Sequence, residues 1–310
     1  MPSLQLQGEI VGECRNCGSV AIKDLGPIGA VAPFLLKRVL NLDTGLAPSR
    51  HRLKRFLRSI RVFREVARKV YGSTVLLEIQ ICTTCSFIQT RIPLPEEGLA
   101  KLYVDYRSDS YNRERIHYEP EYSSIASRVG SDDKEVNGRK GGLTAWLTSK
   151  IDIGSDFSML DYGGADGKFL PDLPGRKYVF EISDIAPIAG IERVKDEASL
   201  GIYSYVQIAH VLEHVPFPLA LTRKASSYLC PKGYLYVEVP QDLSDEEVAQ
   251  LSNGDPNMSV GVHEHINNYT VKSATKLLES AGLTLIEVQP LTLDIGWTKA
   301  RNIRALGRKN

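Results

Sequence analysis

The sequence predicts an α/β fold in which a mainly parallel sheet, covered by helices, follows a smaller N-terminal metal-binding module. Three observations support this prediction. From Phe157 onward, short apolar runs alternate with helix-like stretches, the order that builds a parallel sheet with right-handed crossovers. A glycine-rich turn follows the first of these runs, and two Cys-x-x-Cys pairs precede them. With 310 residues, 43% of them apolar, the chain can form one large domain or a medium and a small one.

The N-terminal module is predicted from four of the five cysteines, which form the pairs Cys14–Cys17 and Cys82–Cys85. A Cys-x-x-Cys turn directs two thiolates at one centre, and two such turns complete the tetrahedral sulfur shell that zinc prefers. A redox dithiol needs only one such motif, so two copies favour a metal. Because four sulfur ligands leave no open position, we expect a structural zinc ion. Cys230 is expected to be a small buried apolar residue.

We place the zinc module at residues 1–125, with a basic helical insertion at about 34–72 between the cysteine pairs. The insertion holds 11 basic and two acidic residues, a net charge of +9 in a chain whose total is +1. Its apolar residues from Leu53 to Val70 recur at helical spacing, and basic residues from Arg50 to Lys69 form the other face. This pattern predicts either a solvated helix face or a docking face for phosphates, an acidic glycan or a membrane surface. Nucleic acid is not expected, because no aromatic residues interleave with the basic ones on this helix face.

Two further segments precede the sheet. A tyrosine-rich stretch suits a site that holds a sugar or phosphate, although half-exposed helices have the same composition. The polar, glycine-ended segment 131–142 predicts a linker or loop. The tyrosine-rich stretch contains Tyr103, Tyr106, Tyr111, Tyr118 and Tyr122, with Arg107, Arg113 and Arg115.

The second domain, residues 126–310, contains the predicted sheet. Sheets of this kind bind ligands at the carboxyl ends of their strands, so motifs at those ends are candidates for chemistry. The strand candidates are Ser158–Tyr162, Lys177–Glu181, Ile191–Lys195, Tyr203–Ala209, Gly233–Val239 and Leu283–Val288, and the helix candidates include Pro218–Leu229 and Val271–Ala281.

The first strand end is followed by a turn that reads Asp161-Tyr-Gly163-Gly164-Ala165-Asp-Gly167. An acid followed by spaced glycines is typical of a Rossmann-like fold, because glycine lets the backbone approach a ligand where a Cβ would collide. Glu181 follows about 20 residues later, the spacing for accepting hydrogen bonds from ribose hydroxyls. A nicotinamide-dependent enzyme would share both features.

The string His210-Val-Leu-Glu213-His214-Val-Pro-Phe-Pro separates these alternatives. With Asp161–Gly167, Glu181 and Asp196, it resembles the class I S-adenosylmethionine-dependent methyltransferases, especially those acting on small metabolites, sugars and glycans. The resemblance implies that Gly163, Gly164, Ala165 and Gly167, after Asp161, line the methionine part of the cofactor. It also implies that Glu181 holds the ribose, that Asp196 lies beside the adenine amine, and that the His210 region closes the pocket. Ala165 departs from the family, which usually has glycine there.

The N-terminal part resembles a narrower group. A Cys-x-x-Cys-Gly start, a second Cys-x-x-Cys followed by Gln89, and the tyrosine-rich stretch are similar to the zinc-binding domain of sugar C-methyltransferases, which modify nucleotide-linked keto-deoxysugars. The chain departs from that group in two respects. Its basic insertion is longer, and the sequence ends soon after the sheet, without their further C-terminal domain.

His263, Glu264 and His265 bring two of the six histidines beside a carboxylate, after a Gly- and Pro-containing loop where a lid is expected. If this segment is extended, the two histidines share one side and Glu264 faces the other. The resemblance implies that the Glu264-His265 pair abstracts a proton, so we predict His265, ahead of His263, as general base with a neighbouring carboxylate fixing its tautomer. A second metal site, or purely structural hydrogen bonds, are the alternatives. Glu213 is expected to brace the following helix and His214 to orient the neighbouring loop.

We therefore expect an S-adenosylmethionine-dependent methyltransferase that methylates an oxygen or carbon of a sugar, nucleotide-sugar or glycan-related metabolite, presumed anionic. The reduced thiolates favour the cytoplasm, and neither a signal peptide nor a membrane span is expected. The alternative is a glycan- or membrane-docking protein in which the nucleotide site is vestigial and the basic insertion binds the partner. An NAD-linked oxidoreductase is disfavoured, because the string from His210 to Pro218 resembles the methyltransferases instead.

Overall fold

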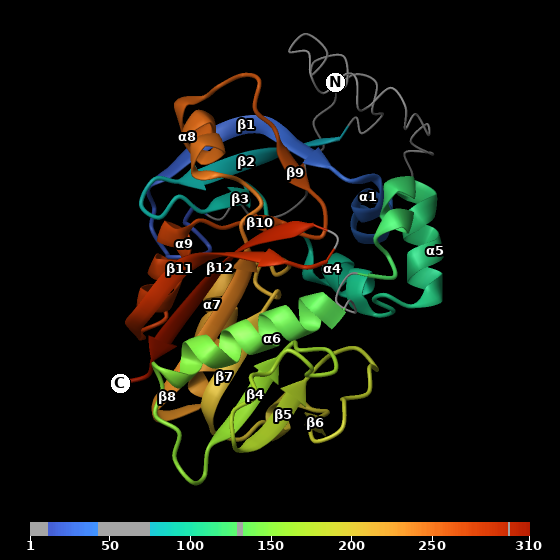
Figure 1. Ribbon diagram of the computed structural model, residues 1–310. Helices are drawn as coiled ribbons and strands as arrows, with labels where there is room; N and C mark the ends of the chain where they lie inside the picture. The colour runs from blue at the N-terminus through green and yellow to red at the C-terminus, as the bar shows by residue number, and fades with distance from the viewer. Residues whose placement is uncertain (1–11, 43–74, 129–132, 297) are drawn as a thin grey trace.

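The computed structural model describes residues 12–42, 75–128, 133–296 and 298–310. These residues form two sheets (Figure 1), one of five strands in the order β10-β3-β2-β1-β9 and one of seven in the order β11-β12-β8-β7-β4-β5-β6. The amphipathic helix predicted at 53–70, with its basic face from Arg50 to Lys69, lies outside the described residues.

The larger sheet confirms the predicted Rossmann-like α/β fold. Its strands β4 to β8 pair in parallel, whereas β11 and β12 at the end of the chain are antiparallel. The chain order reverses between β4 and β7, and this reversal opens a crevice at the carboxyl ends of the strands. The bounds are β4 (Ser158–Tyr162), β5 (Arg176–Phe180), β6 (Glu192–Val194), β7 (Tyr203–Ala209), β8 (Leu229–Pro240), β11 (Thr284–Asp294) and β12 (Lys299–Arg308).

The helices α6 (Asp133–Thr148), α7 (Pro218–Ser227) and α9 (Val271–Ser280) cover this sheet (Figure 1). Helix α9 begins with a capping box between Thr270 and Ser273, which satisfies two backbone N–H groups that the helix itself leaves free. Its apolar side, Ala274, Leu277 and Leu278, is buried in the core under the sheet. Within the described residues, no helix combines the length and apolar character needed to cross a bilayer.

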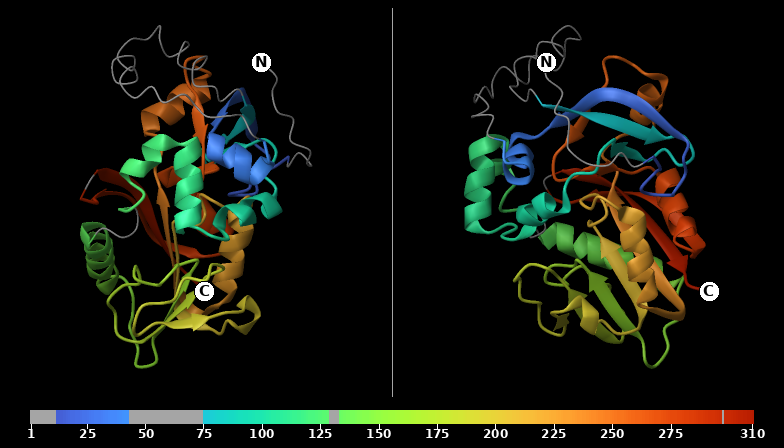
Figure 2. Two further views of the ribbon diagram at one scale, coloured as in Figure 1. Left: turned by 90° about the vertical axis from the view of Figure 1, so that its right-hand side faces the viewer. Right: turned by 180° about the vertical axis from the view of Figure 1, so that it is seen from behind.

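The smaller sheet joins distant parts of the chain. Its strands β1 (Ile22–Val31), β2 (Leu76–Cys82) and β3 (Ile88–Thr90) come from the N-terminal module, but β9 (Val260–Val262) and β10 (Asn267–Asn268) do not. Strand β9 pairs in parallel with β1, and β10 pairs antiparallel with β3. The chain therefore leaves the larger sheet after β8 and completes the smaller sheet with residues 260–268 (Figure 2). The predicted catalytic cluster at 263–265 consequently lies between the two sheets.

Short helices fill the junction between the sheets. Helix α1 buries Phe34, Leu35, Leu36 and Val39, so the first residues of the predicted basic insertion belong to the core of the smaller sheet. The bounds of the remaining helices, with α1 included, are α1 (Pro33–Leu40), α4 (Glu96–Tyr103), α5 (Asp109–Tyr118), η1 (Pro120–Ser124), η2 (Glu197–Ser199) and α8 (Asp245–Asn253).

The linker predicted at 131–142 is wrong for its described residues, because 133–142 belong to helix α6. Gly141 and Gly142 face open space, where they cost helix stability but clash with nothing. The helix is held instead by the buried Leu143, Trp146 and Leu147 in its second half. Tertiary packing has overridden local propensity here.

Candidate active site

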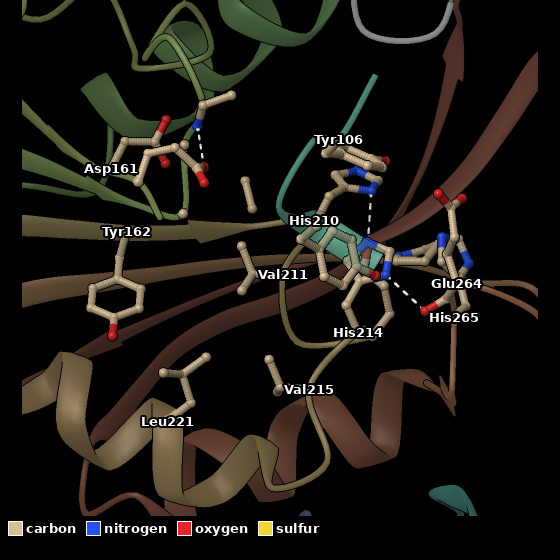
Figure 3. A pocket seen from close by; sticks show the side chains of 18 of the residues that line it. Tyr106, Asp161, Tyr162, His210, Val211, His214, Val215, Leu221, Glu264 and His265 are labelled. Atoms are coloured by element: carbon tan, nitrogen blue, oxygen red, sulfur yellow. Dashed lines mark hydrogen bonds and ion pairs between the residues drawn. The ribbon is translucent and has the colours of Figure 1, made fainter. Parts of the chain in front are cut away.

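A cavity of about 1010 Å³ lies at the carboxyl ends of the central strands of the larger sheet, beside helices α4, α6 and α7. Asp161 and Tyr162 lie at one end of it, His214, Glu264 and His265 at the other, and His210 between them (Figure 3). Its volume reaches the upper end of the range of roughly 300–1,000 Å³ for small-molecule sites. The cavity therefore has room for two small molecules side by side.

Gly163, Gly164 and Ala165 of the turn after β4 line the end of the cavity that contains Asp161. Gly167 instead packs beside Ile191. Gly163 and Gly167 have φ values of +76° and +78°, a left-handed conformation that glycine adopts at little cost. At Gly164 an added Cβ would lie 2.1 Å from the Asp161 Cγ. The sequence pattern is thus required by backbone conformation and by close packing.

Ala165 is also left-handed, with φ +52°, a strain of about 1–2 kcal/mol for a residue with a Cβ. Its backbone N–H donates to Glu181 Oε2 at 3.0 Å, and the Ser183 N–H donates to Glu181 Oε1 at 2.9 Å. Glu181 lines the cavity, and its carboxylate ties the glycine turn to the loop after β5.

Asp196 is the one predicted cofactor residue, apart from Gly167, that the structure places off the cavity lining. Its Oδ1 accepts the Ala198 N–H at 3.0 Å as the N-cap of η2. The next residue, Glu197, lines the cavity and is bound by Tyr162 and, at 2.6 Å, by Lys224. The contact of Asp196 with adenine stays a prediction.

Asp161 is 1% exposed, and its Oδ1 has no hydrogen-bond partner among the described residues. Burial raises the pKa of this carboxyl group to about 7, although Gln207 and Arg139 act to lower it. A buried acid with an unpartnered oxygen at the edge of a cavity fits a cationic group of a ligand.

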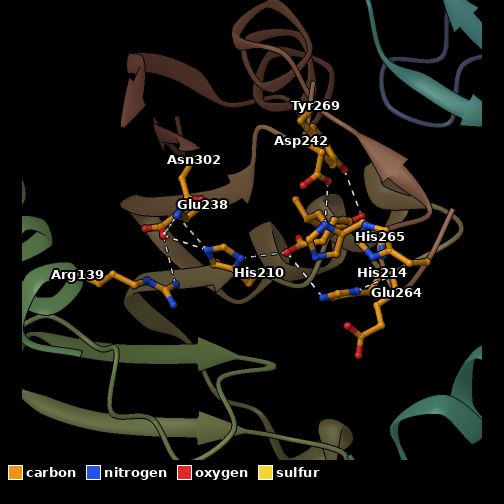
Figure 4. Close-up of polar contacts among 12 residues, drawn as sticks. Arg139, His210, His214, Glu238, Asp242, Glu264, His265, Tyr269 and Asn302 are labelled. Atoms are coloured by element: carbon orange, nitrogen blue, oxygen red, sulfur yellow. Dashed lines mark hydrogen bonds and ion pairs between the residues drawn. The ribbon is translucent and has the colours of Figure 1, made fainter. Parts of the chain in front are cut away.

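Charged side chains form a continuous series of ion pairs along one side of the cavity (Figure 4). Arg139 of α6 pairs with Glu238 at 3.2 Å, Glu238 pairs with His210 at 3.1 Å, and His210 Nδ1 lies 3.2 Å from Glu213 Oε1. Burial and the charge of Arg139 act to lower the pKa of His210, but the two carboxylates outweigh them and raise it to about 9. His210 is therefore an imidazolium that bridges two buried carboxylates.

At the other end, His265 Nδ1 and Asp242 Oδ2 are 2.8 Å apart. Because a carboxylate can only accept, Nδ1 carries a proton, and in the neutral imidazole Nε2 therefore keeps its lone pair. Burial acts to lower the pKa of His265, but the hydrogen bond and charge of Asp242 outweigh it and raise that pKa. The carboxylate that fixes the tautomer of His265 is thus Asp242 and not Glu264, the acid expected from the sequence.

Glu264 points away from the His265 ring. Its Oε1 lies 2.7 Å from Arg115 Nη1 and accepts a hydrogen bond of 2.5 Å from Tyr111. Burial opposes ionisation of Glu264, but Arg115 outweighs it and lowers the pKa to about 2. A carboxylate held this firmly in its ionised form is a weak base near neutral pH.

The rings of His263 and His265 are neighbours, with centroids 4.6 Å apart, although residues 263–266 do not form the extended strand on which the predicted alternation depended. His263 lies off the cavity lining, and its Nδ1 accepts the His265 N–H at 3.3 Å. Burial, together with the charge of His265, lowers the pKa of His263 to about 4. His263 is a neutral acceptor that shapes the backbone.

The tyrosine-rich stretch divides into two parts. Tyr103, Tyr106 and Arg107 line the cavity, whereas Tyr111, Tyr118 and Tyr122 are buried in the protein. The half-exposed helix expected as the alternative does not describe the three buried tyrosines, whereas Tyr103, at the end of α4, and Tyr106 are half-buried.

The four paired cysteines meet although 64 residues separate the two pairs. All four sulfur atoms lie within 4.8 Å of one another, with Cys14–Cys85 at 3.7 Å and Cys17–Cys82 at 3.8 Å. A tetrahedral zinc site with Zn–S bonds of about 2.3 Å places its sulfur atoms about 3.8 Å apart. The donor set and spacing fit a zinc ion.

A comparison with protein families decides the class of this site. Residues 115–288 match the family model described as "Methyltransferase domain", which is more than half of the chain. The chain belongs to this methyltransferase family. The predicted enzyme class, S-adenosylmethionine-dependent methyl transfer, is thereby confirmed. Of the residues predicted for its cofactor, Asp161, the turn from Gly163 to Ala165, Glu181 and His210 line the cavity. No curated protein sequence matches the methyltransferase.

Solved structures resemble it only distantly. Magnesium protoporphyrin IX methyltransferase from Synechocystis PCC 6803, with bound S-adenosylhomocysteine, is 14% identical, with a TM-score of 0.44 over 68% of this chain and 99% of that one. An S-adenosylmethionine-dependent methyltransferase from Methanosarcina mazei is 15% identical, with a TM-score of 0.38 over 51% of this chain and 94% of that one. The family assignment rests on the family model.

Sequence reasoning did not identify Asp242, Arg139 or Glu238 as site residues. Asp242 follows the carboxyl end of β8 by two residues, so the rule that ligands bind at strand ends could have singled it out. Arg139 lies in the segment predicted as a linker, and Glu238 lies within a strand. No local pattern marks either of them.

Proposed function

We propose that this methyltransferase transfers a methyl group to a hydroxyl or an acidic carbon of a sugar, nucleotide-sugar or glycan-related metabolite, with His265 as the general base. One observation carries the proposal: a single cavity joins the glycine turn to the Asp242–His265 pair. Methyl transfer needs a cofactor and an acceptor side by side, with a proton acceptor at the acceptor end.

The cofactor end would hold S-adenosylmethionine through the predicted residues. The unpartnered oxygen of Asp161 suits the ammonium group of the methionine part, and Glu181, beside the turn of Gly163 to Ala165, suits the ribose hydroxyls. Asp196 is proposed to reach the adenine amine only if its hydrogen bond to the Ala198 N–H opens. Its neighbour Glu197 already lines the cavity.

The acceptor end would remove the proton. His265 Nε2 is free to accept because Asp242 holds the proton on Nδ1. Tyr103, Tyr106 and Arg107 line this part of the cavity, a combination suited to stacking on a sugar and pairing with an anionic group. An anionic acceptor is proposed on this ground.

We further propose that Cys14, Cys17, Cys82 and Cys85 hold a structural zinc ion, which their spacing supports and which four thiolates would shield from substrate. Such thiolates persist in a reducing compartment, so we propose the cytoplasm as the location. The alternative of a docking protein with a vestigial nucleotide site gains no support, because its basic segment lies outside the described residues.

Calorimetric titration with S-adenosylhomocysteine tests the cofactor end. Saturable binding to the zinc-loaded protein is expected, and absence of binding by folded protein would refute the proposal. For the acceptor end, a panel of nucleotide-sugars is assayed for methyl incorporation with wild type and His265→Ala. The variant should lose turnover by about 10²–10⁴-fold while retaining its affinity for S-adenosylhomocysteine, and an unchanged rate would show that His265 is not the base.

A further inference from the structure

We propose that Glu213, His214 and His265 form a binding site for a divalent transition-metal ion at the acceptor end of the cavity. Each residue contributes one candidate ligand atom, and these atoms lie within 4.8 Å of one another. All three residues line the cavity. Two imidazoles and one carboxylate on one side of an ion, with open positions opposite, is an arrangement that proteins use for Fe²⁺ and related ions.

Both histidines are already oriented as metal ligands. A metal-bound imidazole almost always donates its other N–H to a carboxylate or a backbone carbonyl. Here His265 Nδ1 faces Asp242 Oδ2 at 2.8 Å, and His214 Nδ1 faces the Glu264 carbonyl oxygen at 2.9 Å. Because both acceptors can only accept, the neutral form of each imidazole has its lone pair on Nε2, where an ion can bind.

Glu213 supplies an independent indication. Its side chain is completely buried, yet its Oε2 has neither a hydrogen-bond nor an ion-pair partner among the described residues. His210 Nδ1 lies 3.2 Å and His214 Nε2 3.7 Å from Oε1, so the charge is only partly compensated. A buried carboxylate is costly unless it is paired or coordinates a metal, and an ion here would satisfy the oxygen that the protein leaves free.

Closing the site needs only a small movement. Tetrahedral ligation at about 2.1 Å places neighbouring ligand atoms about 3.4 Å apart, close to the present 3.7 Å between His214 and Glu213. His265 is 22% exposed at its side chain, and its ligand atom lies within 4.8 Å of those of the other two residues. An ion held here would expose its open positions to the acceptor.

A second set of ligands, Asp242, His263 and His265, also lies within 4.8 Å but is less suited. His263 Nδ1 already accepts the His265 N–H, and His263 lies off the cavity lining. Coordination by Asp242 would also remove the group that orients His265.

The ion and the proposed base use the same lone pair of His265, so the metal-loaded and base-active forms of the enzyme exclude each other. The metal site does not depend on the identity of the methyl acceptor, and its test needs no turnover. The two proposals can therefore fail separately.

Equilibrium dialysis of the full chain at micromolar free Zn²⁺, followed by metal analysis, tests the site. Glu213→Gln and His265→Ala should each bind one zinc ion fewer per chain than wild type, whereas His263→Ala should bind as many as wild type. The readout is the difference between proteins, and zinc that remains on the cysteines reports that a variant is folded. Wild type and both ligand variants binding equal amounts would overturn the proposal, as would loss of the same ion from His263→Ala. Parallel titration of wild type with S-adenosylhomocysteine reports separately on the cofactor end.

Discussion

Replacing Asp161 by asparagine should change how the stability of this protein depends on pH. Burial raises the pKa of Asp161 from an ordinary 3.8 to about 7 in the folded protein. Between these two values the folded state binds a proton that the unfolded state has released. The carboxyl group therefore lowers the free energy of unfolding progressively as pH rises from about 4 to 7, and asparagine, which does not ionise, removes this effect.

The magnitude follows from the shift. Each pH unit within that interval costs about 1.4 kcal/mol, so wild type should lose about 3 kcal/mol relative to Asp161→Asn between pH 5 and pH 8. The packing of the new amide is the same at both pH values and cancels in the comparison. The effects of all other titrating groups cancel as well, to the extent that the variant leaves them unchanged.

Urea unfolding of both proteins at pH 5, 6, 7 and 8, followed by circular dichroism, measures this difference. The stability of the variant minus that of wild type should rise steadily to pH 7 and then level off. A difference that stays constant within about 0.5 kcal/mol would show that Asp161 ionises normally, and the argument from its burial would be refuted.

Three other changes test separate parts of the structure. Gly164→Ala places a Cβ 2.1 Å from the Asp161 Cγ, so it should destabilise the protein by about 1–3 kcal/mol and weaken S-adenosylhomocysteine binding in calorimetry. Arg115→Met leaves the buried Glu264 carboxylate without its cation and should lower the free energy of unfolding by about 3–5 kcal/mol. Cys82→Ser should reduce bound zinc and lower the thermal midpoint by several degrees, as measured by metal analysis and calorimetry.

Matched controls keep these outcomes interpretable. Gly142→Ala meets nothing within 4 Å on helix α6 and should stabilise the protein by about 0.5–1 kcal/mol, so a loss like that of Gly164→Ala would contradict the packing argument. Cys230→Ser removes a thiol outside the cysteine cluster and should retain all zinc. For Arg115→Met, a loss below about 1 kcal/mol would mean that the ion pair with Glu264 contributes little.

Local patterns in the sequence determined much of this molecule. Strands Ser158–Tyr162 and Tyr203–Ala209 were predicted at the residues observed, because a buried parallel strand is a short apolar run bounded by turn residues. The glycine turn was recognisable because left-handed backbone and close packing restrict those positions to glycine or a very small residue. The cysteine pairs could be read in the same way, since two ligands from one tight turn must be close in sequence.

Contacts between distant segments were decided only by the tertiary structure. The pairing of His265 with Asp242 spans 23 residues, and it exists because residues 260–268 cross over to complete the smaller sheet. Helix α6, with Arg139 on it, forms although its glycines favour a loop, because its second half is buried. Hydrophobic periodicity reports which face of an element is buried but not which element will cover it, so the partners of His265, Glu213 and Glu264 emerge only when the two sheets pack together.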